Sequence, residues 1–289
     1  MIRPSYLSDA AINQFIDAAL AEDIGEADHS TLATISSELH HSARLMVKED
    51  GTIAGLELAE RIFLRYDDRL RIEFFKKDGD QIQAGDVAFV VNGPARSILS
   101  TERFVLNCMQ RMSGIATYTH RLCKIIEGTK ARLMDTRKTT PNFRMMEKWA
   151  VAIGGGLNHR FALYDMIMLK DNHVDVAGGI QAAVERTREY LRITKKDLKI
   201  EVETRNLEEV EAVIRVGGVA VIMLDNMKIE DMKRAISLID GKFRTEASGG
   251  ITESNLRAVA ECGVDYISVG ALTHSVKSLD LSLKVNRAV

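Results

Sequence analysis

The second half of this chain alternates short apolar, β-branched runs with segments of helical periodicity. The runs begin near residues 131, 166, 199, 220, 244 and 266, and the last four starts are 21, 24 and 22 residues apart. This spacing leaves room for one helix between strands and suits consecutive right-handed βα units. The rhythm therefore predicts a parallel α/β barrel. A doubly wound open sheet is the alternative, because periodicity does not fix the number or the order of strands.

Each run ends in a polar or glycine-containing group: "LMDTRK", "IMLKDNH", "IEVET", "IMLDN", "EASGG" and "ISVGA". The active site of a parallel barrel lies at the carboxyl ends of its strands, and an open parallel sheet also binds ligands at that edge. Under either architecture we expect these groups to converge at one mouth.

The first half of the chain has a different pattern. "SDAAINQFIDAALAEDIG" predicts an amphipathic helix with Ser8 as its N-cap and Gly25 after its end. Residues 43–99 contain β-type runs interrupted by Asp-Gly pairs, which suit tight hairpin turns. A second helix follows, with Ser100 as its expected cap and Gly128 beyond its end. This half reads as a small sheet-and-helix domain.

The composition excludes several classes of protein. The chain has 289 residues, of which 46% are hydrophobic and 28% charged, as in a soluble globular protein of two domains. Its formal net charge of −2 gives no general attraction for nucleic acid or anionic lipid, and no apolar stretch is long enough to span a membrane. Cys108, Cys123 and Cys262 are widely spaced and form no CxxC pair, so we expect a cytoplasmic protein without disulfides.

Two glycine-containing loops follow the last two predicted strands: "ASGGIT" at 247–252 and "SVGALTHS" at 268–275. Glycines let backbone N–H groups approach a phosphate closely, and a helix N-terminus adds a favourable dipole. The pair predicts a phosphate monoester site lined by Ser248, Gly249, Gly250 and Gly270. The alternative is two ordinary loops that require positive φ angles.

Cations gather in the segment 135–173, which holds six Lys or Arg residues and four Asp or Glu residues. Arg137, Lys138 and Lys170 follow predicted strands, and Arg160 follows the flexible "GGGLNH". Arginine offers a planar fork and lysine a mobile point charge, so their mixture suits a ligand with several anionic groups. A single surface cation is usually only solvated, but four at one rim indicate an anionic ligand.

Glu201, Glu203 and Asp225 lie at neighbouring strand ends with the opposite charge. A few carboxylate oxygens are a usual way to hold Mg²⁺ when a substrate phosphate supplies the remaining ligands. The alternative is that these carboxylates only pair with the cations across the mouth. Lys170 also permits a Schiff-base reading, since aldolases use a lysine of this kind. Phosphate loops, carboxylates and cations together predict a site for a pyrophosphate-activated sugar phosphate and a small acidic acceptor.

At these residues the chain resembles the quinolinate phosphoribosyltransferase family. The resemblance runs nearly end to end through "ALAEDIG", "GTIAGLELA", "GDQIQAGDV", "GPARSIL", "TERFVLNCMQRMSGIAT", "DTRKTTP", "GGGLNHR", "YDMIMLKDNH", "EVE", "LDN", "ASGGI" and "VGALTHS". It implies an N-terminal α/β sandwich-like domain, residues 1–112, joined by the C-terminal tail 276–289. It further implies an incomplete parallel, TIM-like α/β barrel of fewer than eight strands in residues 113–275, and a homodimer.

The resemblance also implies roles for individual residues. The quinolinate site would comprise Arg137, His159, Arg160 and Lys170, with Arg103 contributed across the dimer interface. The phosphoribosyl pyrophosphate site would comprise Lys138, Glu201, Asp225, Ser248, Gly249, Gly250, Gly270 and His274. Glu201 and Asp225 would contact Mg²⁺, partly through water or substrate. Lys138, Lys170, Glu201 and Asp225 would be catalytic in a transfer that yields nicotinate mononucleotide, CO₂ and pyrophosphate.

The chain departs from the family at one place: Asn142-Phe143 stands where members commonly have Gly-Leu after "TTP". Asparagine tolerates a left-handed backbone better than most residues, so we expect the turn to survive. Other hypotheses are a relative linked to molybdenum transport, an aldolase-type lyase that uses Lys170, and a sugar-phosphate sensor without turnover. The complete cation set in "NHR" and "LKDNH" favours quinolinate over the first of these.

Overall fold

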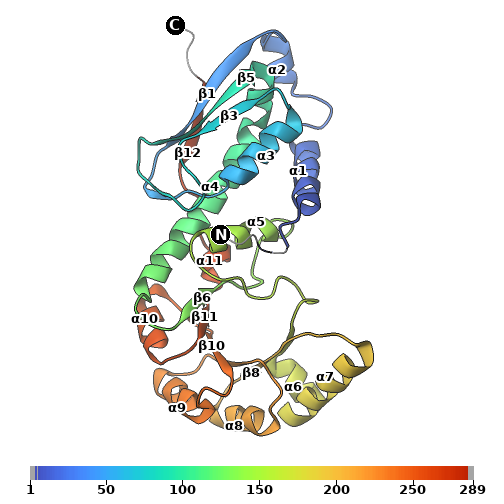
Figure 1. Ribbon diagram of the computed structural model, residues 1–289, viewed down its shortest axis with the longest axis vertical. Helices are drawn as coiled ribbons and strands as arrows, with labels where there is room; N and C mark the ends of the chain where they lie inside the picture. The colour runs from blue at the N-terminus through green and yellow to red at the C-terminus, as the bar shows by residue number, and fades with distance from the viewer. Residues whose placement is uncertain (1–3, 5, 286–289) are drawn as a thin grey trace. The chain divides into compact units, whose positions relative to one another are not determined.

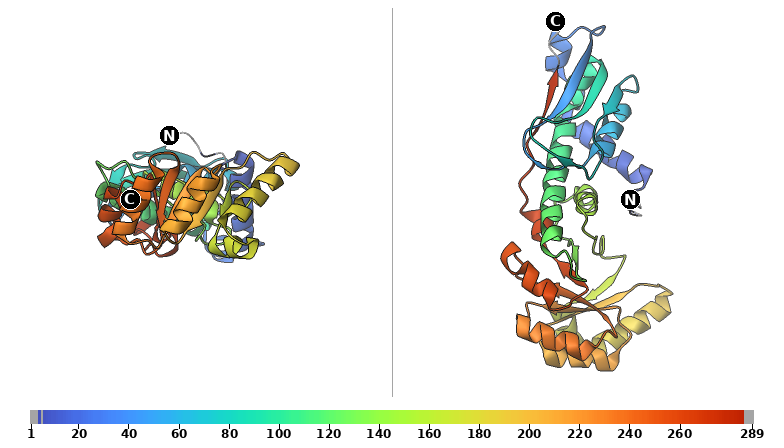
Figure 2. Two further views of the ribbon diagram at one scale, coloured as in Figure 1. Left: turned by 90° about the horizontal axis from the view of Figure 1, so that it is seen from below. Right: turned by 60° about the vertical axis from the view of Figure 1, so that its left-hand side comes forward.

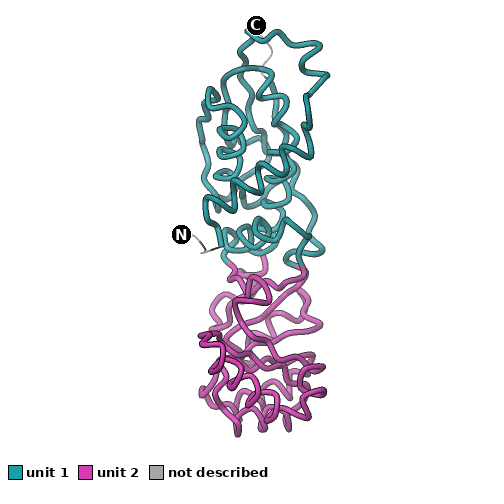
Figure 3. The backbone as a smooth tube through the Cα atoms, turned by 90° about the vertical axis from the view of Figure 1, so that its right-hand side faces the viewer, with its two compact units in different colours: residues 1–120, 139–155, 272–289 teal, residues 121–138, 156–271 magenta. Residues whose placement is uncertain are grey.

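The computed structural model describes residue 4 and residues 6–285, and the chain forms two compact units (Figure 3). The first unit contains residues 1–120, 139–155 and 272–289, and the second contains residues 121–138 and 156–271. Among the described residues, no helix is both long and apolar enough to cross a membrane. The domain boundary expected after residue 112 stays a prediction, and residues 286–289 of the expected tail lie outside the described part.

The first unit is built on a four-stranded antiparallel sheet in the order β12-β1-β5-β3 (Figure 1). The strands are β1 (His40–Val47), β3 (Arg71–Phe74), β5 (Val87–Pro94) and β12 (Leu281–Val285). Ala43, Leu45 and Val47 are buried and alternate with more exposed residues, so one face of β1 belongs to the core. Helix α3 (Leu56–Tyr66) covers this core, since its Phe63 ring lies 5.9 Å from the ring of Phe89 on β5.

The predicted Asp-Gly hairpins are wrong. β2 (Gly51–Thr52) pairs with β4 (Gln81–Ile82) in a separate two-stranded sheet, whereas β1 and β3 each pair with β5. The strands on either side of each Asp-Gly pair therefore belong to different sheets. Asp78 instead accepts hydrogen bonds from the backbone N–H groups of Leu56 and Glu57 at the start of α3.

The predicted ends of the first-unit helices are partly confirmed. Helix α1 (Asp9–Asp23) starts after Ser8, whose hydroxyl accepts from the N–H of Ala11 at 3.2 Å. A short α2 (His29–Thr34) follows. Helix α4 (Ala95–Ile125) begins directly after β5, five residues before the expected cap. Ser100 therefore lies inside the helix, where its hydroxyl donates to Asp28 at 2.9 Å.

The C-terminal segment packs closely against α4. Leu279 N–H donates to the carbonyl of Gln110, and the side chain of Gln110 donates to the carbonyl of Leu281. A β-carbon on Gly114 would overlap the backbone carbonyl of Lys277. Only glycine therefore lets the segment approach the helix this closely.

The second unit contains a six-stranded parallel sheet in the order β6-β11-β10-β9-β8-β7. Its strands are β6 (Arg132–Met134), β7 (Ile167–Leu169), β8 (Ile200–Thr204), β9 (Val221–Asp225), β10 (Arg244–Ser248) and β11 (Tyr266–Ser268). The linking helices are α6 (Asp171–Ala177), α7 (Ile180–Thr194), α8 (Leu207–Val216), α9 (Ile229–Ile239) and α10 (Glu253–Glu261). These helices lie along the outer side of the curved sheet (Figure 1; Figure 2, left).

The strands lie where the periodicity predicted them, and the expected incomplete barrel is confirmed. With helices on its outer side, this sheet is a barrel segment and not a doubly wound sheet. Two further helices, α5 (Arg144–Ile153) and α11 (Ala271–His274), lie in the first unit or at its boundary. Asn142, in the turn before α5, has a φ of 62°, so this residue adopts the left-handed backbone for which asparagine is suited.

The contact at Gly114 gives a test of the packing in the first unit. We predict that Gly114→Ala lowers the free energy of unfolding, measured by chemical denaturation. Overpacking costs about 1–3 kcal/mol, which exceeds the ~1 kcal/mol that alanine gains over glycine inside a helix. Asn107→Ala, at an exposed position of the same helix, is the matched control and should not lower the stability. A stabilised Gly114→Ala protein would contradict the close packing.

Candidate active site

Strand register places several carboxylates on one face of the parallel sheet. Glu203 on β8 is level with Met223 on β9, which is level with Glu246 on β10. Because alternate residues of a strand share a face, Glu201 and Asp225 point to the same side as these three. Glu201 and Glu246 are almost fully buried, at 0% and 2% exposure. The face is therefore strongly acidic at its centre.

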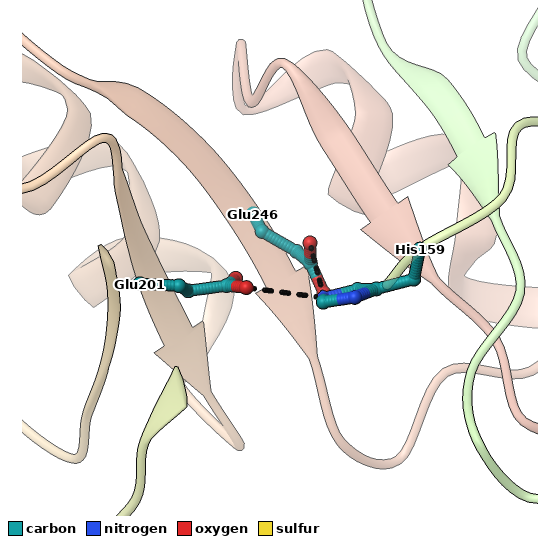
Figure 4. A group of neighbouring side chains, drawn as sticks. All are labelled: His159, Glu201 and Glu246. Carbon is teal, nitrogen blue, oxygen red and sulfur yellow. Dashed lines mark ion pairs between the residues drawn. The ribbon is translucent and has the colours of Figure 1, made fainter. Parts of the chain in front are cut away.

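Glu201 and Glu246 flank the imidazole of His159 (Figure 4). Nε2 of His159 lies 3.1 Å from Glu201 Oε2 and 3.4 Å from Glu246 Oε2. These ligand atoms lie within 4.8 Å of one another, so among the described residues this group could hold a metal ion. Sequence reasoning missed Glu246. A charged residue in the middle of a buried strand was the available signal.

Asp135 determines where His159 lies. This fully buried residue follows β6 and accepts from the backbone N–H of His159 at 2.8 Å and from the side chain of Asn158 at 2.7 Å. Leu157 pairs alongside β6 through hydrogen bonds with Leu133 and Asp135. The first residue of "DTRKTTP" therefore holds the "NHR" segment against the sheet, a role that the sequence analysis did not assign.

The two carboxylates control the ionisation of His159. Burial by itself lowers the pKa of His159, but the adjacent carboxylates of Glu201 and Glu246 outweigh it and raise this pKa to about 10. Nδ1 accepts from the backbone N–H of Arg160 at 2.6 Å, which places the proton of the neutral ring on Nε2. A second proton on Nδ1 would displace that N–H, so ionisation requires a small movement of residues 159–160. Burial raises the pKa of Glu201.

Two of the predicted cations of the second unit, Lys170 and Arg160, lie near these carboxylates. Lys170, directly after β7, places Nζ 3.0 Å from Glu203 Oε2. Arg160 donates to the carbonyl of Met166 at 3.0 Å. Burial and the nearby positive charge of Arg137 lower the pKa of Arg160. Neighbouring guanidinium groups suit a ligand with two anionic groups.

The loop after β10 has the backbone expected of a phosphate loop. Gly249 and Gly250 have φ angles of 83° and 61°. Asn226 lies against this loop: its backbone N–H donates to the carbonyl of Ser248 at 2.8 Å, and a β-carbon on Gly249 would overlap its side chain. Asn226 also donates to Asp225 at 2.6 Å. Asn226 is thus a supporting residue that sequence reasoning missed, although the "LDN" motif contained it.

The predicted site residues divide between the two units. Arg137, Lys138, His159, Arg160, Lys170, Glu201, Asp225, Ser248, Gly249, Gly250 and Gly270 belong to the second unit. Arg103, exposed on α4, and His274, whose Nδ1 is 2.5 Å from the hydroxyl of Ser275, belong to the first. The structure therefore brings together the central carboxylates, His159, Arg160 and Lys170 within one unit.

Comparisons with known proteins indicate the same family in both halves of the chain. The quinolinate phosphoribosyl transferase N-terminal domain model matches residues 28–113, and the C-terminal domain model matches residues 115–284. The chain is 45% identical to the chloroplastic nicotinate-nucleotide pyrophosphorylase [carboxylating] of Oryza sativa subsp. japonica, over 98% of this chain and 79% of that protein. It is 41% identical to a probable nicotinate-nucleotide pyrophosphorylase [carboxylating] of Bacillus subtilis, over 95% of this chain and 93% of that protein. The crystal structure of NadC from Streptococcus pyogenes has a TM-score of 0.92 and 40% identity, over 98% and 99% of the two chains.

The geometry around His159 predicts the effect of removing one carboxylate. Glu246→Gln should lower the pKa of His159 from its value of about 10, because one of two groups that favour the imidazolium is neutralised. The pKa is measured by NMR titration of the His159 ring signals. Glu203→Gln is the matched control, since Glu203 pairs with Lys170, and it should leave this pKa nearly unchanged. Equal titration in wild type and Glu246→Gln would contradict the arrangement.

The same shift fixes the sign of a stability effect. The folded pKa lies above the ordinary value of 6.5, so the contribution of the imidazolium to the free energy of unfolding is complete below about pH 6.5. It is lost as the pH rises toward 10. Glu246→Gln should lose less stability than wild type over this interval.

Proposed function

The chain belongs to the quinolinate phosphoribosyltransferase family, and we propose that it transfers the phosphoribosyl group of phosphoribosyl pyrophosphate to quinolinate. The products are nicotinate mononucleotide, CO₂ and pyrophosphate, and the reaction belongs to NAD biosynthesis. The observation that carries this conclusion is the match of both family domain models, in order, over residues 28–284. The relatives' names, nicotinate-nucleotide pyrophosphorylase [carboxylating] and quinolinate phosphoribosyltransferase [decarboxylating], describe the same reaction in its two directions.

The cations of the second unit form the proposed quinolinate site. Arg137 and Arg160 supply guanidinium groups whose charges interact, and Lys170 and His159 supply further positive charge. Two carboxylates on one small ring fit such a group because each can be paired with its own cation. The positive charge of these cations is offset by the surrounding carboxylates of Glu201, Glu203 and Glu246.

The phosphoribosyl pyrophosphate site is proposed to lie at the adjacent strand ends. Ser248, Gly249 and Gly250 would receive the 5-phosphate on backbone N–H groups, since the positive φ angles of the two glycines turn successive N–H groups outward. Gly270 and His274 would complete this cradle. The side chain of Lys138 is exposed, and it would contact the pyrophosphate.

Mg²⁺ is a proposed cofactor, and the carboxylate oxygens of this face are the hard ligands that it requires. Glu201 is level with Val221, which is four residues before Asp225. At about 3.3 Å per residue, Glu201 and Asp225 are therefore roughly 13 Å apart along the strand direction. Glu203 is level with Met223, only roughly 7 Å before Asp225 by the same measure. Asp225 and Glu203 thus fit one ion better, and Glu201 would act through water or substrate. The bound ion would neutralise the charge of the pyrophosphate.

The proposed chemistry depends mainly on placement and charge. As pyrophosphate leaves C1 of the ribose, positive charge develops on the sugar, and Glu201 and Asp225 would stabilise it. The quinolinate nitrogen then attacks C1, the 2-carboxylate leaves as CO₂, and the electron pair left on C2 takes up a proton from solvent. Lys138 and Lys170 would stabilise negative charge on the leaving pyrophosphate and on the substrate carboxylates. Holding both substrates in contact supplies much of the rate enhancement.

Two other aspects of the function are also proposals. A homodimer would let Arg103 of one subunit reach the quinolinate site of its partner. We propose a cytoplasmic location on the basis of the cysteine pattern, although relatives are named as chloroplastic or mitochondrial. The aldolase hypothesis is disfavoured because the Lys170 side chain is 49% exposed and paired with Glu203, whereas a Schiff-base lysine requires apolar surroundings.

The assay of the proposed function follows nicotinate mononucleotide, CO₂ and pyrophosphate together, with quinolinate, phosphoribosyl pyrophosphate and Mg²⁺ as reactants. We expect all three products in equal amounts. Nicotinate should be a poorer acceptor by on the order of 10⁴-fold in kcat/KM, because it leaves cations of the diacid site unpaired. Nicotinamide serves as a further control and should fare no better. Comparable turnover of nicotinate and quinolinate would overturn the assignment.

Subunit complementation tests the shared site. Arg103→Ala and Arg137→Ala proteins should each be inactive, and a mixture that exchanges subunits should recover part of the activity, because some mixed sites are intact. Exchange is followed by fluorescence transfer between labelled subunits. The control is a mixture of two differently labelled Arg137→Ala preparations, which should remain inactive. Proven exchange without recovery would exclude the contribution of Arg103 across an interface.

A further inference from the structure

Glu147, in α5, is a carboxylate with no solvent exposure and four hydrogen bonds. Oε1 accepts from Arg111 Nε at 3.1 Å, from Arg111 Nη2 at 2.8 Å and from the hydroxyl of Thr140 at 3.0 Å. Oε2 accepts from the backbone N–H of Thr140 at 3.0 Å. Thr140 is only two residues beyond Lys138, so Glu147 holds the end of the "DTRKTTP" segment.

Arg111 extends this network to a second segment. Its guanidinium also donates to the backbone carbonyl of Thr273 and, at 2.8 Å, to that of Val276. These two residues flank His274 and Ser275. One ion pair, between the buried Glu147 and the 23% exposed side chain of Arg111, therefore joins the segment that follows the quinolinate cations to the segment that carries a proposed phosphate ligand. Glu147, Arg111, Thr140 and Thr273 all belong to the first unit.

The hydrogen-bond partners of Glu147 and Arg111 indicate the role of this ion pair. Withdrawing two charges from water is costly, and well-packed apolar residues often stabilise a fold equally well. Outside the pair, the side chains of Glu147 and Arg111 form hydrogen bonds with Thr140, Thr273 and Val276. The pair therefore forms hydrogen bonds with two segments of the chain, and each segment lies next to proposed substrate ligands.

We propose that Glu147 is a positioning residue for both substrates: it fixes the "DTRKTTP" segment directly and the 273–276 segment through Arg111. The inference rests on the proposed function. Glu147 acts through Thr140 and Arg111 and takes no part in the chemistry. Its loss lets both segments move, and a misplacement of about 1 Å can lower an enzymatic rate by about 10²-fold.

The decisive variant is Glu147→Gln, which preserves the volume but replaces one acceptor oxygen with a donor group. The amide cannot accept from both Arg111 and the N–H of Thr140. We expect a higher KM for quinolinate and for phosphoribosyl pyrophosphate, and a fall in kcat/KM of about 10²-fold. Thr140→Ser, which retains both hydrogen bonds to Glu147, should remain close to wild type. Thr140→Val, which loses the hydroxyl bond, should shift both KM values in the same direction as Glu147→Gln.

Asp78→Asn provides the matched structural control. Asp78 is another carboxylate of the first unit that accepts backbone hydrogen bonds, in its case from Leu56 and Glu57 at the start of α3. It should lose thermal stability and keep the wild-type KM values. Wild-type KM values in Glu147→Gln, or the same kinetic loss in Asp78→Asn at an equal fall in Tm, would overturn the inference. If Glu147→Gln does not fold, the Thr140→Val and Thr140→Ser pair decides.

The outcome is separate from that of the proposed function. Failure of the wild-type protein to form nicotinate mononucleotide would overturn the function itself. An active wild type together with an equally active Glu147→Gln protein would overturn only the positioning role.

Discussion

The hydrogen bonds that Asp135 accepts from residues 158 and 159 are the interaction on which the proposed site depends. The parallel sheet is an incomplete barrel, so in the described part of the chain β6 has an edge that no further strand of the sheet covers. The segment around Leu157 pairs with that edge instead, and Asp135 ends this pairing by holding the next two residues. His159 is thereby directed over the sheet toward Glu201 and Glu246, which come from strands at its middle.

This arrangement brings opposite charges together inside the protein. Because removing charged groups from water costs free energy, we infer that these charges are kept for function and not for stability. Buried charges lose their hydration, and their mutual attraction often only compensates for that loss. Here the carboxylates of β8 and β10 are matched by His159, Lys170 and Arg160, which come from loops at the sheet's edge. A diacid and a pyrophosphate can therefore replace protein carboxylates as partners of the same cations. In such a site the positive charges are already paired with protein carboxylates. An anionic substrate then takes the place of a carboxylate, and the protein need not hold a cluster of unpaired cations before the substrate binds.

The sequence predicted much of the fold because the strands of the second unit are defined locally, by short apolar runs at regular spacing. It failed where the outcome depends on distant partners. Ser100 has the chemistry of a helix cap, yet the residues before it extend the helix back to β5 and Asp28 takes its hydroxyl. Asp78-Gly79 resembles a hairpin turn, but Asp78 caps α3. Many site residues were found within motifs, although Asp135 and Asn226 were missed there because they act by supporting other residues. The pairing of His159 with Glu246 depends on sheet register that no local pattern reveals.

The turn at Asn142 illustrates how the chain departs from its family without losing the rim of the site. The left-handed backbone at Asn142 explains why glycine is common there, and asparagine is among the residues that bear this conformation at low cost. The turn is closed by a hydrogen bond from the N–H of Phe143 to the carbonyl of Thr140, and Phe143 packs on Phe15 at 5.7 Å. Glu147 holds the backbone N–H of Thr140 at the other side. Because both backbone groups of Thr140 are held through hydrogen bonds that need no side chain at position 142 or 143, these two side chains can change while the backbone beside the cations stays fixed.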